Sequence, residues 1–206
     1  MFIALFTIFI ICIFEYLYKN KNTNIDIIPL CTSSICTFAT HYMCYTDFDM
    51  YWNIYAYTNE DIPVYTKIVT EMLYGYSIYE VLDYLRTRRI DFLIHGLSLF
   101  IMFSNMYWLG AIHTVFPALI TETSSIILSL RKGDNKKKWW VNIGFVLLFF
   151  IYKLCIFPYM LYHSIMDNRN PVRMYTFLYG APFIILNIYW GYLIGCNILR
   201  TLGIHI

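Results

Sequence analysis

The chain has 206 residues, of which 59% are hydrophobic, 20% aromatic and only 14% charged. A soluble domain is nearer half apolar and a quarter charged, so the composition excludes a soluble enzyme and a disordered tail. The net charge of +2 is too small for a nucleic-acid-binding module. Seven membrane helices of about 20 residues each would use roughly 140 residues, which leaves no room for a separate globular domain.

Seven apolar runs follow one another, and each is long enough to cross a bilayer. They are predicted at 1–18, 27–45, 63–85, 90–108, 111–130, 139–162 and 174–199. The first run has no basic residues before it and no small-residue cleavage site after it, so we interpret it as a retained span rather than a signal peptide. Residues 1–26 are then the first span with its cytoplasmic loop, and residues 27–206 form the main helical membrane domain.

Three local features refine these spans. The second run carries five Ser and Thr residues and His41, which predicts a helix packed inside the bundle because hydroxyls in lipid need partners. The short joint at Gly110 predicts an antiparallel hairpin of the fourth and fifth spans, and Pro158 predicts a kink in the sixth. The six cysteines form no C-x-x-C pair, and we interpret them as buried free thiols.

The basic residues alternate with the predicted spans. Segments 19–21, 86–89 and 131–138 together with Arg200 hold 11 of the 15 lysines and arginines, and all fall on one side if there are seven spans. The opposite side carries most of the acidic stretch 47–61. Because basic loops accumulate in the cytoplasm, we predict a lumenal N-terminus and a cytoplasmic C-terminus.

Ionisable side chains inside spans are costly, so each is a functional hypothesis. Glu80, His95 and Glu122 lie about 9, 8 and 13 Å from the cytoplasmic ends of three successive spans, at 1.5 Å per residue. They are predicted to share one polar pocket, where His95 would act as a general base beside a carboxylate. The alternative is that they only hydrogen-bond one another and fix the packing of the helices. Lys153 is left inside the sixth span.

Motifs of soluble enzymes are absent from the sequence. It contains no G-x-S-x-G, no H-E-x-x-H and no glycine-rich phosphate loop, so hydrolase, zinc-protease and nucleotide-binding functions have no support. We expect no metal site and no cofactor.

Four motifs, in order, resemble the signature elements of the TLC-domain family of membrane proteins. Residues 75–80 (GYSIYE) resemble its "G-Y-hydrophobic-hydrophobic-Y-D" helix, and residues 91–95 (DFLIH) resemble the acidic residue and histidine of the next helix. Residues 122–125 (ETSS), with Leu130-Arg131 after them, resemble its "E-x-S-T … L-R" helix. Residues 186–190 (LNIYW) resemble its "L-N-x-Y-W" signature. The resemblance covers roughly residues 29–200.

The resemblance implies an all-α integral membrane protein of about seven transmembrane helices, which form a TLC-like bundle around a cavity for lipid or acyl chains. It also implies a location in the endoplasmic reticulum or another internal membrane. The family's ceramide synthases transfer an acyl group from acyl-CoA to a sphingoid base. They are expected to use adjacent histidines in the helix that matches the fourth span, and two aspartates in the helix that matches the fifth. Here the second histidine position is Gly96, and the aspartate positions appear as Glu122 and Ser125. The departures move the chain toward the family's smaller members, which are not ceramide synthases.

The leading hypothesis is therefore a multi-pass TLC-like protein that handles membrane lipids; no catalysis is assigned to it, and no nucleic-acid binding is expected. The polar end of a lipid would bind at Glu80, His95, Glu122, Ser125 and Asn187. The alternative is an acyl-CoA-dependent N-acyltransferase with His95 as general base and Glu122 as its partner; Gly96 would leave space there but no second base. A receptor or channel is the third hypothesis, and only the second span resembles a channel lining. The sequence does not predict an oligomeric state.

Overall fold

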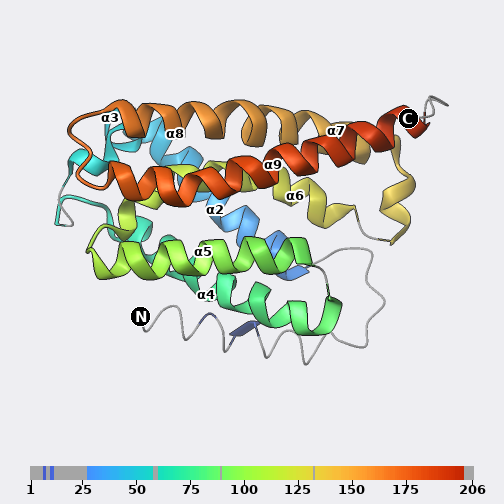
Figure 1. The fold of residues 1–206 in the computed structure, drawn as a ribbon, viewed down its shortest axis with the longest axis horizontal. Helices are drawn as coiled ribbons and strands as arrows, with labels where there is room; N and C mark the ends of the chain where they lie inside the picture. Colours follow the sequence, from blue (N-terminus) through green and yellow to red (C-terminus); the bar gives the residue numbers. More distant parts are fainter. Residues whose placement is uncertain are drawn as a thin grey trace.

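The computed structural model consists of long helices that lie side by side and run roughly along one direction (Figure 1). The structure describes residues 27–57, 60–88, 90–131 and 133–201, together with Thr7, Ile10 and Ile11. The predicted first span, 1–18, therefore lies outside the described residues except at those three positions. The long segments are α2 (Ile27–Thr46), α4 (Val64–Thr87), α5 (Ile90–Trp108), η2 with α6 (Ile112–Glu122 and Thr123–Leu130), α7 with η4 and α8 (Trp139–Phe149, Phe150–Ile156 and Phe157–Met166), and α9 (Arg173–Thr201).

The shorter elements lie at the two ends of this bundle. At one end, α3 (Phe48–Trp52) and η1 (Ile54–Ala56) connect α2 to α4, and a loop joins α8 to α9. At the other end, η3 (Gly133–Lys137) connects α6 to α7, close to the connection between α4 and α5 and to the C-terminal end of α9 (Figure 1). The predicted up-and-down order of the described helices is therefore present, and the basic connections 86–90 and 131–138 share one end.

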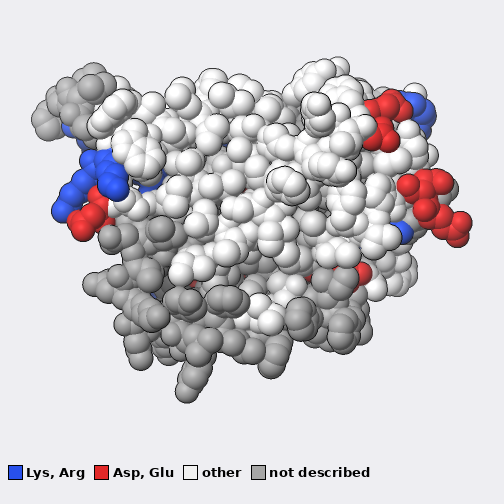
Figure 2. Space-filling view, turned by 180° about the vertical axis from the view of Figure 1, so that it is seen from behind, with Lys and Arg blue, Asp and Glu red and all other residues white. Residues whose placement is uncertain are grey.

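On the face shown in Figure 2, the described surface between the two ends is almost free of charge. Lysine and arginine gather at the end of the α6–α7 connection, and aspartate and glutamate lie mainly at the opposite end (Figure 2). Within the described residues, three segments are long and apolar enough to cross a membrane: Ile112–Leu130, Trp139–Met166 and Arg173–Arg200. Helix α4 carries Lys67, Glu71, Glu80 and Asp83, which lowers its apolar character although its 24 residues span about 36 Å.

Helix α2 packs one face into the bundle, as its hydroxyl side chains predict. Six of its residues are buried: Thr32, Ser33, Cys36, Ala39, Thr40 and Met43. The Thr40 hydroxyl donates to the Cys36 carbonyl at 2.8 Å, so the helix satisfies that buried hydroxyl itself. Cys31 of the same helix and Cys155 of η4 are exposed, and Cys44 and Cys196 are half-buried. The prediction of buried thiols is therefore correct for Cys36 and wrong for Cys31 and Cys155.

The fifth predicted span starts as a 3₁₀-helix rather than an α-helix. Element η2 continues for 11 residues around Pro117, which has no N–H to donate to an α-helical partner. The hydroxyl of Tyr51 in α3 donates to the Pro117 carbonyl at 3.0 Å and holds this segment in the core. The rise of about 2.0 Å per residue in a 3₁₀-helix makes η2 with α6 about 34 Å long, enough to cross a bilayer. Gly110, at φ 67°, makes the tight turn that precedes it.

The sixth predicted span contains a π-helical segment, η4, instead of a simple kink at Pro158. The Phe157 N–H donates to the Tyr152 carbonyl, five residues back. In the same pattern, the N–H of residue 158 would donate to the Lys153 carbonyl. Because Pro158 has no N–H, that carbonyl needs another partner. The amide of Asn187 in α9 donates to that carbonyl at 3.4 Å. The wide turn and the asparagine together hold Lys153 in the interior of the bundle, where it is buried.

Candidate functional site

Helices α4 and α5 bring the first predicted pair together. Glu80 lies on the buried face of α4, and its Oε2 is 2.8 Å from Nδ1 of His95 on α5. A further side-chain hydrogen bond joins Tyr76 to Glu80 one helical turn away. The His95 ring packs on two aromatic rings of α9, at centroid distances of 5.6 Å to Phe183 and 5.8 Å to Trp190. The carboxylate thus orients the imidazole, and Nε2 is the nitrogen left without Glu80.

Gly96 marks the place where α4 and α5 approach most closely. A Cβ atom built on Gly96 would lie 3.0 Å from Glu80 Cβ, 3.1 Å from the Val81 backbone nitrogen and 3.2 Å from Val81 Cγ2. The prediction that Gly96 leaves space was wrong, because the neighbouring helix fills that space. A second histidine would not fit here unless the two helices moved apart.

Glu122 lies at the junction of η2 and α6 and collects partners from three other elements. The Ser33 hydroxyl of α2 donates to Oε2 at 3.2 Å, and Nζ of Lys153 in η4 lies 3.9 Å from Oε1. Ser125, one turn along α6, adds a side-chain hydrogen bond to the same carboxylate. The side chains of Glu122 and Lys153 are only 17% and 10% exposed, so this is an ion pair in the interior.

Two of the five predicted site residues, Glu80 and His95, form one acid–base pair. A third, Glu122, pairs with Lys153, which was not among the five. Glu80 binds His95, whereas Glu122 binds Ser33, Ser125 and Lys153, and no direct hydrogen bond joins His95 to Glu122 among the described residues. Asn187 is buried with its amide directed at the Lys153 carbonyl, so it supports the lysine. Ser33 and Lys153 were missed as site residues. The only signal for Lys153 was its isolated charge within an apolar run.

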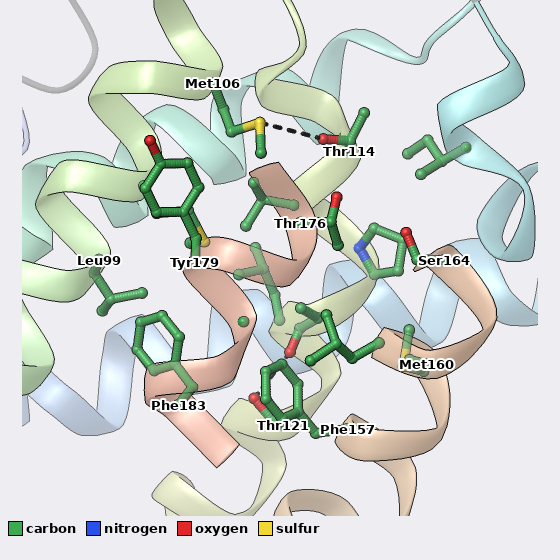
Figure 3. A pocket seen from close by; sticks show the side chains of 18 of the residues that line it. Leu99, Met106, Thr114, Thr121, Phe157, Met160, Ser164, Thr176, Tyr179 and Phe183 are labelled. Atoms are coloured by element: carbon green, nitrogen blue, oxygen red, sulfur yellow. Dashed lines mark hydrogen bonds between the residues drawn. The ribbon is translucent and has the colours of Figure 1, made fainter. Parts of the chain in front are cut away.

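The Glu122–Lys153 pair and the His95 ring open onto one cavity of about 130 Å³. His95, Glu122, Lys153 and Asn187 line it, and the rest of its wall is mostly apolar. Figure 3 shows the wall side chains converging from α5, η2, α8 and α9: Leu99, Met106, Thr114, Thr121, Phe157, Met160, Ser164, Thr176, Tyr179 and Phe183. Because a cavity of about 150 Å³ in another protein holds benzene, this one has room for about six non-hydrogen atoms.

The loops at the far end of the cavity are joined by a polar network. Asp167, after α8, accepts from the Tyr55 hydroxyl at 2.8 Å and from the Arg169 guanidinium at 2.7 Å. Arg169 also donates to Asn53 at 3.0 Å, so the network connects the α8–α9 loop to η1. Trp52, Ile54, Tyr55, His163 and Ser164 in these segments line the cavity. The network therefore holds together the loops that flank this part of the cavity wall.

The pH dependence of this network follows from its carboxylate. Hydrogen bonds from the side chain and backbone of Arg169 and from Tyr55 hold the pKa of Asp167 well below its usual range. A lowered folded-state pKa means that the stabilisation is complete above the unfolded pKa of about 3.9 and is lost only as the pH falls through the lower folded value. We therefore expect equal amide protection of residues 53–57 and 167–170 at pH 7 and pH 5 in hydrogen exchange, after correction for intrinsic rates.

Asp167→Asn should lower that protection at both pH values, because an amide does not replace the charged partner of Arg169. The control is Asp134→Asn, whose ion pair with Lys137 is 3.2 Å long and exposed at the other end of the bundle. Loss of protection in the wild-type protein between pH 7 and pH 5 would contradict the assignment.

Comparison with known proteins adds one finding. The family model of the TLC domain matches residues 22–196, which is most of the chain and includes every element that lines the cavity. No curated protein and no solved structure matches the chain.

Proposed function

Because the chain belongs to the TLC-domain family, we propose that it is a multi-pass membrane protein that binds lipid or acyl chains in the cavity between α5, η2, η4, α8 and α9. The observation that carries the proposal is the cavity itself, which has His95, Glu122 and Lys153 in its wall and mostly apolar side chains around the rest. Such a cavity suits a molecule with a small polar end and a hydrocarbon chain. In this proposal Glu80, His95, Glu122 and Ser125 hold the polar end, and Asn187 supports them through Lys153.

The test is retention of lipid by the purified protein. Mass spectrometry of the protein extracted in mild detergent should find a co-purifying long-chain lipid. His95→Ala should reduce its amount about tenfold or more, because the substitution removes the ring at the polar end and leaves Glu80 buried without its partner. The control is His41→Ala in α2, which removes an exposed histidine bonded to Tyr152 outside the cavity lining. Equal lipid in both variants and the wild type would overturn the proposal.

A second function is supported by one observation. The Glu80 carboxylate at Nδ1 of His95 leaves Nε2 as a base, which is the arrangement required for general-base catalysis by an acyl-CoA-dependent N-acyltransferase. Transfer of a radiolabelled acyl group from acyl-CoA to sphinganine tests it. His95→Gln keeps a donor for Glu80 but removes the base, so lipid retention without transfer in this variant would favour catalysis by the wild type. Absence of transfer in the wild type would leave lipid binding as the function.

We further propose seven spans with a lumenal N-terminus and a cytoplasmic C-terminus, in the endoplasmic reticulum or another internal membrane. The shared end of the basic connections 86–90 and 131–138 supports this orientation. A protease site or tag placed after Ile206 should be accessible from the cytoplasm, and one placed near Glu60 should be protected. The reverse pattern of accessibility would contradict the orientation.

A further inference from the structure

Lys153 has an ammonium group that the described residues do not use for a hydrogen bond. Its Nζ is 3.9 Å from Glu122 Oε1, beyond the 2.7–2.9 Å of a charge-assisted hydrogen bond, and 5.9 Å from the Trp190 ring centre. The side chain is 10% exposed, and it lines the cavity. Its backbone is held in place by Asn187. The group is therefore fixed at the cavity wall with hydrogens available for a ligand.

The electrostatics of the cavity limit the kind of ligand. At the cavity wall the Glu122 carboxylate faces the Lys153 ammonium, so these two lining groups together carry no net charge. A ligand with a full charge would have to compete with a protein side chain for its partner, and an uncompensated charge in an apolar interior is costly. An uncharged lipid head group that forms hydrogen bonds avoids this cost of burying a charge.

We infer that the cavity binds an uncharged acyl lipid, an ester or amide, whose carbonyl oxygen accepts a hydrogen bond from Lys153 Nζ. This inference rests on the proposed lipid-binding function and names the class of lipid. A hydroxyl or amide N–H of the same head donates to Glu122 Oε1, since Ser33 already occupies Oε2. The acyl chain lies along the wall formed by Leu99, Phe157 and Phe183.

The size of the cavity agrees with this class of ligand. About 130 Å³ holds the carbonyl, its neighbouring atoms and the start of a chain. A charged phosphate head with its hydration shell needs more room than this. The cavity wall also offers both a hydrogen-bond donor, Lys153, and an acceptor, Glu122. An ester with a free hydroxyl bonds to both, because its carbonyl accepts and its hydroxyl donates.

Competition binding tests the inference on the wild-type protein in detergent. Radiolabelled 1-monooleoylglycerol is the probe, and the competitors share its oleoyl or oleyl chain: unlabelled monooleoylglycerol, N-oleoylethanolamine, oleate, oleoyl lysophosphatidate and oleylamine. We expect the two uncharged lipids to compete at least tenfold better than the three charged ones. Stronger competition by oleate, by lysophosphatidate or by oleylamine would overturn the inference.

Substitutions identify the group that binds the carbonyl. The double variant Glu122→Gln with Lys153→Met removes both charges together, so it keeps the interior neutral, and it should bind monooleoylglycerol about 10- to 100-fold more weakly. The matched variant Glu122→Gln with Lys153→Gln restores a donor at the lysine position and should recover part of the affinity. Unchanged affinity in the Met variant, with elution and thermal unfolding like those of the wild type, would refute the role of Lys153.

The same experiment separates the two proposals. If wild type binds none of the lipids, the proposed function fails together with the inference. If lipid binds in a His95-dependent manner but charged lipids compete best or the lysine variants bind normally, only the inference fails.

Discussion

Gly96→His is expected to destabilise the protein by about 3 kcal/mol or more, although it restores the residue type that the ceramide synthases carry at this position. The Cβ alone would press against Glu80 Cβ at 3.0 Å and the Val81 backbone at 3.1 Å, and an imidazole needs far more room. Helices α4 and α5 would have to separate, which also breaks the 2.8 Å contact between Glu80 and His95. Thermal unfolding in detergent, followed by circular dichroism, measures the loss.

Gly96→Ala and Gly144→Ala provide the matched pair for this prediction. A Cβ on Gly144 in α7 meets nothing within 4 Å, so its substitution should be neutral or slightly stabilising. Gly96→Ala should cost about 1–3 kcal/mol, since its contacts include backbone that does not yield. A Gly96→His protein as stable as the wild type would show that the two helices move apart easily and that a second imidazole fits.

Glu122→Ala is the second substitution with a large expected effect. It leaves the Lys153 ammonium in the interior without its carboxylate and removes the acceptor of Ser33, and breaking a buried pair in this way typically costs about 3–5 kcal/mol. Replacing both partners, Glu122→Gln with Lys153→Met, should recover most of the stability because no charge is left unpaired. Thermal unfolding of the single and double variants measures the difference.

The exposed ion pair between Asp134 and Lys137 is the control for Glu122. Its partners are 77% and 84% exposed, so Asp134→Ala should change the stability by less than about 1 kcal/mol. If Glu122→Ala were no more destabilising than Asp134→Ala, the pair would be solvated and the cavity would be open to water at its inner end.

The meeting of Glu80 and His95 could be predicted from the sequence because it depends only on helix geometry. In adjacent helices of regular rise, two residues at equal depth are neighbours if both face inward. The partner of Glu122 could not be predicted in this way. Glu122 stands at the end of a 3₁₀-helix, and Lys153 lies in a π-helical segment. Because both helix types differ from the α-helix in residues per turn, the two side chains point in directions that an ideal α-helix does not give.

The proline positions show the same limit. Pro117 and Pro158 both predict an interrupted α-helix, since neither can donate a backbone hydrogen bond. Which irregular helix forms depends on the neighbours that satisfy the free carbonyls. Tyr51 from α3 binds the carbonyl of Pro117 itself, and Asn187 from α9 binds that of Lys153. These partners lie 66 and 34 residues away in the chain, so no local pattern reveals them.

The sequence by itself determined that the chain is an all-helical membrane protein of the TLC-domain family, with the bounds of its long helices correct to within a few residues, because apolar runs and short motifs are local properties of the chain. Only the tertiary structure decided that Gly96 is closed off by α4, that Lys153 pairs with Glu122, and that this pair and His95 line one cavity. Each of these depends on how closely two distant segments pack, and that distance is set by the shapes of all the side chains between them.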